Sequence, residues 1–290
     1  LAAIGNLTTA ADKLPYFSDV DTVALTAFPT FARSLVGVST KEAAKILLGA
    51  SGSGNYIGIP GKQGFGVGIC PELLPGFLPL TGTYDVTSDD YGNYQYSDGS
   101  IVVWIPAFYA RIGHADNPTY ATYGVNSVHT VPISAFADKT AANAAGYFLP
   151  RCFIDGSTIK AGFFIDKYMC SNNAGIASSI KNGNPLSSAA DHNPFSGLTG
   201  APSNTYAGAW KAAKTRGAAF FVTSRFMYAA LALLSLAHGQ AAISATNCAW
   251  YDASGVTNFP KGCNNNALKD TNDTTVTYTS DGYSNCGKTG

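Results

Sequence analysis

The chain has 290 residues, of which 46% are hydrophobic, so it can bury the core of one large domain or of two modest ones. Basic and acidic residues are equal in number at 18 each, and only 12% of all residues are charged. This balance offers no basic surface for nucleic acid or for an anionic membrane. We therefore expect partners that are recognised through neutral hydrogen-bonding groups and aromatic faces.

Residues 1–53 are predicted to form a neck of short helices, because they are rich in Ala, Leu and Thr and are interrupted by proline and glycine. One helix is expected to begin at Ser39, which forms a capping box with Glu42, and to end at Gly49. Such a short helix cannot bury its apolar face alone, so we expect the same helix of neighbouring subunits to cover it in a homotrimer. The residues expected at the trimer contact are Ile46, Leu47 and Leu48.

Residues 54–290 form the second predicted unit, in which short aromatic and β-branched segments alternate with turns. The predicted strands cover residues 56–59, 66–69, 101–112 and 161–170. Residues 81–100 are rich in Asp, Tyr and Gly and are expected to form a loop or an exposed hairpin. A long polar loop is expected over residues 171–203.

Two helices are predicted next, so the second unit is expected to be α+β. The first covers residues 205–215 and is rich in Ala. The second is capped by Thr223 or Ser224, ends at His238-Gly239 and should be largely buried. Its apolar stripe consists of Met227, Ala230, Leu231 and Leu234. The apolar run in this helix is too short for a bilayer, which takes roughly 20 residues, so no membrane insertion is expected.

Candidate catalytic and metal-ligating residues are few. The only glutamates are Glu42 and Glu72, which argues against glycoside hydrolysis by a carboxylate pair. Oxygen ligands that a calcium ion would accept gather at residues 85–98 and 270–273. Neither group has EF-hand spacing, so solvated turns without a cofactor are the favoured interpretation and calcium is the alternative. The histidines occur in no recognisable catalytic motif.

The six cysteines show neither a CxxC pair nor even spacing, which argues against a zinc ribbon and against a dense disulfide framework. We expect buried free thiols. A disulfide among the last three cysteines is the alternative in an oxidising milieu. These three residues are Cys248, Cys263 and Cys286.

Residues 245–290 are rich in Asn, Gly, Asp and Thr and are expected to form long ordered loops, where function often resides. Aromatic faces can stack on sugars or side chains, and Asn supplies both donors and acceptors. The candidate receptor-binding residues are Trp250, Tyr251, Asn258, Asn264, Asn265, Asn266 and Tyr283. The alternative is that Trp250 belongs to the core and that the asparagines only hold turns.

Two stretches resemble known families. Residues 4–50, with GNLTTAADKLPYF at 5–17 and FARSL at 31–35, resemble the linker repeats of phage and prophage tail fibres. The chain from about residue 103 onward resembles the C-type-lectin-like domain of formylglycine-generating enzymes and of variable phage adhesins. The segments that carry this second resemblance are GFFIDKY at 162–168 and AAKTRG at 212–217.

The chain also departs from the second family. Its later Gly-Asn-x-Trp-Glu signature is absent, so we expect the lectin-like domain to continue beyond Gly290. No position matches the oxygen-activating cysteine pair of the enzymes, so enzymatic activity is not carried over and the chain is expected not to be an enzyme. The resemblance implies a lectin-like fold and an adhesive role.

Together these features predict a homotrimeric phage tail-fibre adhesin, in which the helical neck precedes a C-type-lectin-like, receptor-binding domain over residues 54–290. Its expected partners are other tail or baseplate proteins and a bacterial surface receptor. It would be assembled in the host cytoplasm and reside in the tail fibre of the virion. The alternatives are an oxidase of the formylglycine-generating type and a purely structural spacer in the fibre or baseplate.

Overall fold

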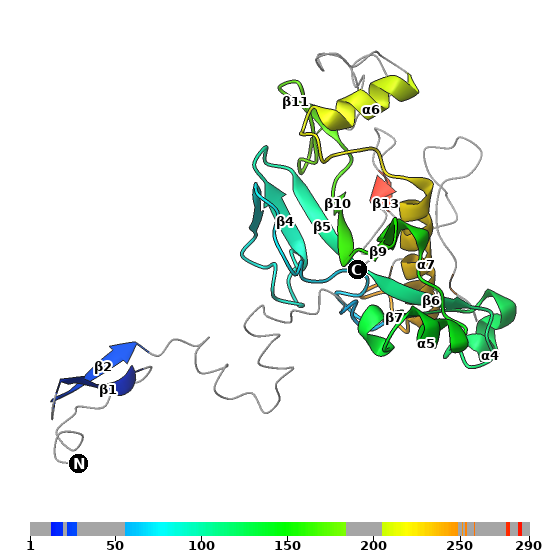
Figure 1. The fold of residues 1–290 in the computed structure, drawn as a ribbon, viewed down its shortest axis with the longest axis horizontal. Coiled ribbons are helices and arrows are strands. Elements are labelled where there is room, and N and C mark those ends of the chain that lie inside the picture. Colours follow the sequence, from blue (N-terminus) through cyan, green and yellow to red (C-terminus); the bar gives the residue numbers. More distant parts are fainter. Residues whose placement is uncertain are drawn as a thin grey trace. The chain divides into compact units, whose positions relative to one another are not determined.

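A computed structural model describes residues 13–19, 22–27, 56–183 and 205–248, together with positions 251, 253, 258, 277–278 and 284–285 (Figure 1). The chain divides into two compact units, Leu1–Gly52 and Ser53–Gly290. The helix expected from Ser39 lies outside the described residues, and so do its trimer-contact positions. These positions are Ile46, Leu47 and Leu48. The trimeric neck therefore stays a prediction.

In the first unit the described residues form an antiparallel hairpin of β1 (Lys13–Asp19) and β2 (Thr22–Ala27). The prediction of short helices is wrong for this stretch. Aromatic and β-branched residues favour strands here, and Pro15 would interrupt a helix. A hairpin accepts Pro15 opposite Leu25 because both of its strands are edge strands.

The second unit is α+β, and its largest sheet has four antiparallel strands in the order β10-β5-β4-β3. These strands are β3 (Phe77–Pro79), β4 (Asn93–Tyr96), β5 (Ile101–Pro106) and β10 (Gly162–Asp166). A separate pair consists of β6 (Phe108–Ile112) and β7 (Val128–Pro132). The strand predicted over 101–112 is thus two strands. The break follows Pro106, which has no N–H to donate, and the Ala107 N–H bonds to the carbonyl of Ala161.

Short elements complete the unit. The remaining hairpins are β8 (Ile154–Asp155) with β9 (Thr158–Ile159), β11 (Ser171–Asn173) with β12 (Ile176–Ser178), and β13 (Thr277–Tyr278) with β14 (Ser284–Asn285). The short helices are α4 (Tyr120–Tyr123), α5 (Lys139–Ala144) and three 3₁₀ turns, η1 (Gly124–Asn126), η2 (Ile133–Ala135) and η3 (Arg151–Phe153).

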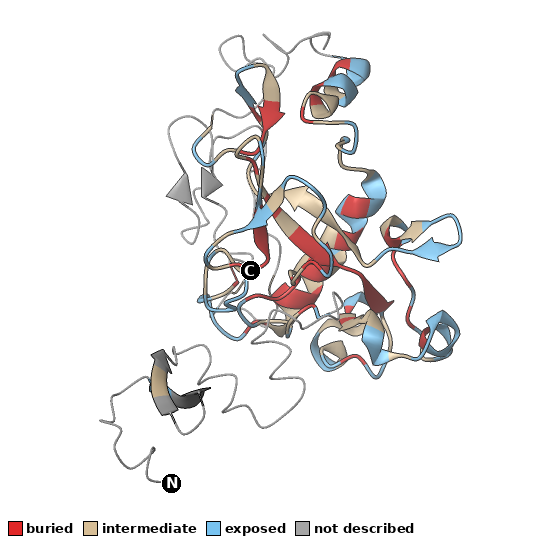
Figure 2. Ribbon diagram, turned by 60° about the vertical axis from the view of Figure 1, so that its left-hand side comes forward, coloured by how far each residue is buried: buried red, intermediate tan, exposed pale blue. Residues whose placement is uncertain are grey.

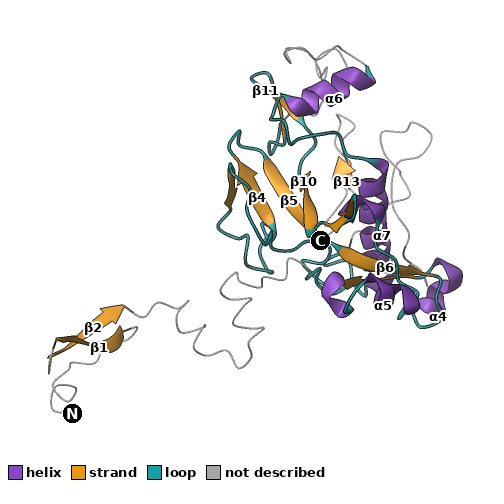
Figure 3. Cartoon of the chain, viewed as in Figure 1, coloured by secondary structure: helices purple, strands orange, loops and turns teal. Residues whose placement is uncertain are grey.

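The two longer predicted helices are confirmed. Helix α6 (Tyr206–Lys214) begins after Thr205, whose hydroxyl accepts a hydrogen bond from the Gly208 N–H at 2.9 Å. Helix α7 (Arg225–Ala241) begins after Ser224, which caps the Met227 N–H. Helix α6 lies beside β12, and α7 lies against β7 and η3 (Figure 3). Among the described residues, none of the helices has both the length and the apolar content that crossing a bilayer requires.

The main core lies between α7 and strands β5 and β6 (Figure 2). Phe108 and Phe153 are completely buried there and meet edge to face, with ring centroids 5.4 Å apart. Of the stripe predicted on α7, three residues are buried and Leu231 is half-buried. The three buried residues are Met227, Ala230 and Leu234.

Three local predictions are wrong. Residues 56–59 and 66–69 are not strands but irregular segments on either side of a turn, because Gly58 and Gly66 adopt positive φ angles of 74° and 86°. The region 81–100 contains β4, which is an inner strand of the sheet and carries the fully buried Tyr94. The loop expected from residue 171 contains the β11-β12 hairpin, whereas residues 184–204 lie outside the described residues.

Candidate functional site

A cavity of about 750 Å³ opens between the four-stranded sheet, α6 and the segment that joins α6 to α7. This volume is typical of a site for a small organic molecule. The sheet and the joining segment supply an aromatic wall, which consists of Phe77, Tyr96, Phe164 and Phe220. Helix α6 supplies an alanine face, which consists of Ala209, Ala212 and Ala213. The polar end of the cavity consists of Asp166, Cys170 and Arg216.

The aromatic wall is held by contacts among its own rings. Phe77 and Tyr96 are cross-strand neighbours on β3 and β4, and their ring centroids are 4.8 Å apart. Phe77 also stacks on Phe164 at 4.7 Å, and Tyr96 meets Phe220 edge to face at 4.8 Å. Each such pair stabilises by about 0.5–1.5 kcal/mol beyond the burial of its area. The wall is therefore preformed.

Helix α6 has two contrasting faces because its side chains differ in size with the helical period. Gly208 and Ala212 are buried, whereas Tyr206 and Trp210 are 82% and 46% exposed. Tyr206 and Trp210 are four residues apart and so lie on the same face of the helix. The Lys214 ammonium lies 5.1 Å from the centroid of the Trp210 ring. The outer face of α6 is therefore an exposed aromatic row.

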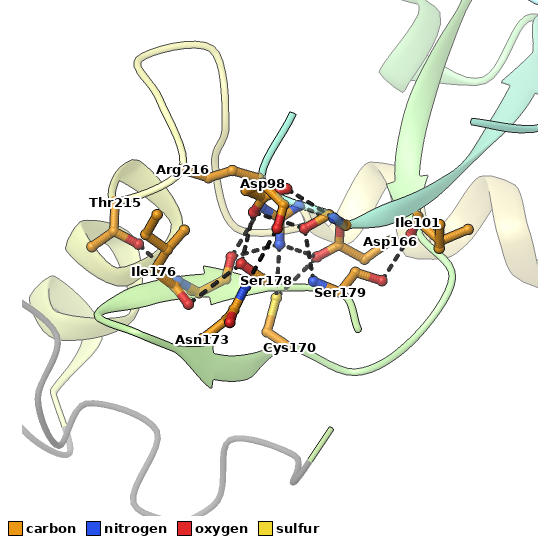
Figure 4. A network of polar contacts seen from close by, with 12 residues as sticks. Asp98, Ile101, Asp166, Cys170, Asn173, Ile176, Ser178, Ser179, Thr215 and Arg216 are labelled. Atoms are coloured by element: carbon orange, nitrogen blue, oxygen red, sulfur yellow. Dashed lines mark hydrogen bonds and ion pairs between the residues drawn. The ribbon is translucent and has the colours of Figure 1, made fainter. Parts of the chain in front are cut away.

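At the polar end, Arg216 lies between two carboxylates (Figure 4). Its side chain is 3% exposed, and Nη1 and Nη2 both donate to the Asp166 carboxylate. Nε lies 3.4 Å from Oδ2 of Asp98, whose side chain is 7% exposed. Nε and Nη2 also donate to the carbonyl oxygen of Ala177. We call Arg216, Asp98 and Asp166 the buried ion cluster.

Serine side chains complete the environment of Asp98. Its carboxylate accepts hydrogen bonds from the N–H and hydroxyl of Ser100 and from the hydroxyl of Ser178, all at 2.9 Å or less. Burial by itself lowers the pKa of the Arg216 guanidinium, but the hydrogen bonds and charge of Asp166, together with the charge of Asp98, raise it overall. Arg216 is therefore held in its charged form.

Cys170 is unsuited to thiolate chemistry. Its thiol donates to Oδ2 of Asp166 at 2.9 Å. Burial, followed by the charge of Asp166, raises the pKa of the thiol to about 12. The thiol is therefore protonated at neutral pH and is a poor nucleophile. The four described cysteines are free, as predicted, but only Cys70 and Cys248 are buried, whereas Cys152 and Cys170 are half-buried. Cys263 and Cys286 lie outside the described residues.

Only two of the predicted receptor-binding residues fall within the described part of the chain. Tyr251 is half-buried, and its N–H donates to the Cys248 carbonyl. The side-chain amide of Asn258 donates to the carbonyls of Gly239 and Ala242, at 2.8 and 3.3 Å, and so closes the end of α7. The other five lie outside the described residues, and they are Trp250, Asn264, Asn265, Asn266 and Tyr283.

The interpretation of residues 85–98 as solvated turns is wrong for Asp98. Asp98 is not solvated, because it pairs with Arg216 inside the protein, and Asp90 pairs with Lys167 at 3.3 Å. Within the described part of the chain, no three His, Cys, Asp or Glu side chains converge as metal ligands, and residues 270–273 lie outside it. His238, predicted as a simple helix end, is 3% exposed, and α7 continues past it to Ala241.

The buried ion cluster and the cavity were not anticipated from the sequence. The cluster unites a turn, the end of a strand and the segment after α6, which are far apart along the chain. The only local signal is an arginine placed between an alanine-rich helix and a phenylalanine-rich segment in a chain with few charges. That signal does not name the carboxylates.

Comparison with known proteins gave no match: no protein-family model, no curated protein and no solved structure is significantly similar to the chain. Fold and site together define an α+β protein with a preformed, aromatic-lined cavity and an exposed aromatic row on α6.

Proposed function

We propose that the chain is the receptor-binding part of a phage tail fibre, a homotrimeric adhesin whose C-type-lectin-like head attaches to a bacterial surface structure. Other tail or baseplate proteins would anchor it in the virion. The observation that carries the proposal is the exposed aromatic row of Tyr206 and Trp210 on a protein without net charge. The resemblance of residues 4–50 and of residues 103 onward to fibre and adhesin sequences supports it.

The exposed aromatic row is not needed for the packing of α6. The buried face of this helix consists of small residues, and Tyr206 and Trp210 project from the exposed one. Aromatic side chains exposed together favour contact with a partner, and Trp and Tyr are enriched among the residues that dominate binding energy. Their flat faces can stack on a sugar ring or on a receptor side chain. The chain as a whole has no net charge, and the cation beside the row is Lys214, which lies over the Trp210 ring.

Trimerisation would make weak binding by each head sufficient. Once one head has bound, the other two heads of the shaft are held at a high effective concentration near further receptors. This raises avidity by roughly 10²-fold to 10⁴-fold over the affinity of a single head. Each head could thus bind its receptor weakly, and attachment of the particle would still be stable.

The test compares adsorption of the purified intact chain to host cells with that of Trp210→Ala and Tyr206→Ala. A central aromatic contact is worth about 2 kcal/mol or more, so we expect Trp210→Ala to weaken cell binding by roughly 30-fold. The matched control is Tyr84→Ala, since Tyr84 is 45% exposed but lies between β3 and β4. It should leave binding within about twofold.

Sedimentation of the same preparation tests the assembly, and we expect a trimer. Wild-type adsorption by Trp210→Ala, or equal losses in the Tyr84→Ala control, would remove α6 as the receptor contact. A monomer that does not bind cells would refute the adhesin as a whole.

A further inference from the structure

The buried ion cluster at the polar end of the cavity carries an unbalanced negative charge. Two carboxylates, Asp98 and Asp166, face one guanidinium, that of Arg216. No second cation pairs with either carboxylate within the described ranges. Because the cluster is mostly buried, this charge is weakly screened and acts on whatever occupies the cavity.

Arg216 has little capacity left for an anion. Its Nε and Nη2 donate to the Ala177 carbonyl, its Nη1 and Nη2 donate to Asp166, and Nη2 also lies 3.4 Å from the Cys170 sulfur. Asp166 differs, because its side chain is 27% exposed and it lines the cavity. Its oxygens accept three hydrogen bonds, whereas a carboxylate offers about four lone-pair sites. The polar group available to a ligand is therefore a negatively charged acceptor.

The aromatic wall also favours a cation. The faces of aromatic rings attract cations within about 6 Å of the ring centroid. Phe220 shows this property within the protein, since the Arg216 guanidinium lies 4.9 Å from its centroid. The rest of the wall and the alanine face of α6 offer apolar surface to the remainder of a ligand.

We propose that the cavity binds a small organic ammonium ion with an apolar body. Its ammonium group donates a hydrogen bond to Asp166, and its apolar body lies between the aromatic wall and the alanine face of α6. The volume of about 750 Å³ accommodates such a molecule. The inference does not rest on the receptor-binding role, because neither Tyr206 nor Trp210 lines the cavity.

Calorimetric titration of the purified full chain with phenethylammonium tests the charge preference. The comparison ligands are 2-phenylethanol, which has a similar shape without the charge, and phenylacetate, which has the opposite charge. A charge-assisted hydrogen bond is stronger than a neutral one, so we expect the cation to bind roughly tenfold more tightly than the alcohol. Phenylacetate should show no binding.

Two substitutions on α6 locate the binding. Ala213→Leu narrows the cavity from the alanine face of α6, at a residue that is not part of the buried ion cluster, and should abolish binding of phenethylammonium. Ala207→Leu introduces the same side chain at an exposed position of the same helix and should leave the affinity within about twofold. The proposal is overturned if the cation does not bind or binds no better than the alcohol. It is also overturned if Ala213→Leu retains binding or if both substitutions weaken it equally.

Discussion

Replacing Arg216 by Met should destabilise the protein more than any other single charge removal at this site. Met has a similar length and fills the space, so the main loss is electrostatic. The Asp98 side chain, 7% exposed, and the Asp166 carboxylate would both lose their cation, and the Ala177 carbonyl would lose two donors. Removing one partner of a buried ion pair typically costs about 3–5 kcal/mol, because the remaining charge stays buried and unpaired.

The size of this loss can be read from thermal melting followed by circular dichroism. For a domain of this size, 1 kcal/mol corresponds to roughly 2–4 °C in Tm, so Arg216→Met should melt roughly 6–20 °C below the wild type. The matched control is Arg225→Met at the exposed start of α7, where a cation faces the positive helix end. Its stability should change by no more than about 0.5 kcal/mol.

The pH dependence separates this electrostatic cause from a packing defect. Protonation neutralises a buried carboxyl group and so removes the cost of burying its charge, whereas it leaves a packing defect unchanged. The deficit of Arg216→Met should therefore be largest at neutral pH and should shrink as the pH falls. Equal melting of Arg216→Met and Arg225→Met, or a deficit independent of pH, would refute the reasoning.

Two further predictions concern the core. Burial lowers the pKa of His238, although its hydrogen bond to the Asn247 carbonyl raises it, so the unfolded chain binds this proton more readily. The free energy of unfolding should therefore fall as the pH drops below about 6.5. The variant His238→Gln can still accept a hydrogen bond from the Gly61 N–H, and in denaturant titrations it should flatten this pH dependence. A pH dependence equal to that of the wild type would contradict the prediction. In the same titrations, Leu234→Ala should lower the free energy of unfolding by about 2–5 kcal/mol. Ile243→Ala, at a position that is 75% exposed, should lower it little. Equal losses in the two variants would contradict the assignment of Leu234 to the core.

Helices α6 and α7 could be predicted because their signals are local. Thr205 and Ser224 cap N–H groups three residues ahead of them, and the periodic apolar residues of α7 mark its buried face. The strands β5 and β10 were likewise indicated by their own aromatic and β-branched residues. Each of these elements is specified by residues within a few positions of one another.

The hairpin at residues 13–27 and strand β4 were missed for the opposite reason. A strand is stabilised by the strands that pair with it, and β4 is inner because β3 before it and β5 after it both pair with it. Its Asn93 and Gln95 read as loop residues, yet Tyr94 between them is fully buried. Local composition cannot report such pairing.

The amino-acid sequence by itself determined the neutral charge, the α+β class of the second unit and the start of its two longer helices, because these depend on composition and on neighbours along the chain. Only the tertiary structure decided which of the aspartates is buried. Asp98 belongs to an acid-rich turn and looks solvated until the fold brings Arg216 against it. The cost of burying a charge depends on its partner, and the partner is chosen by packing between distant segments.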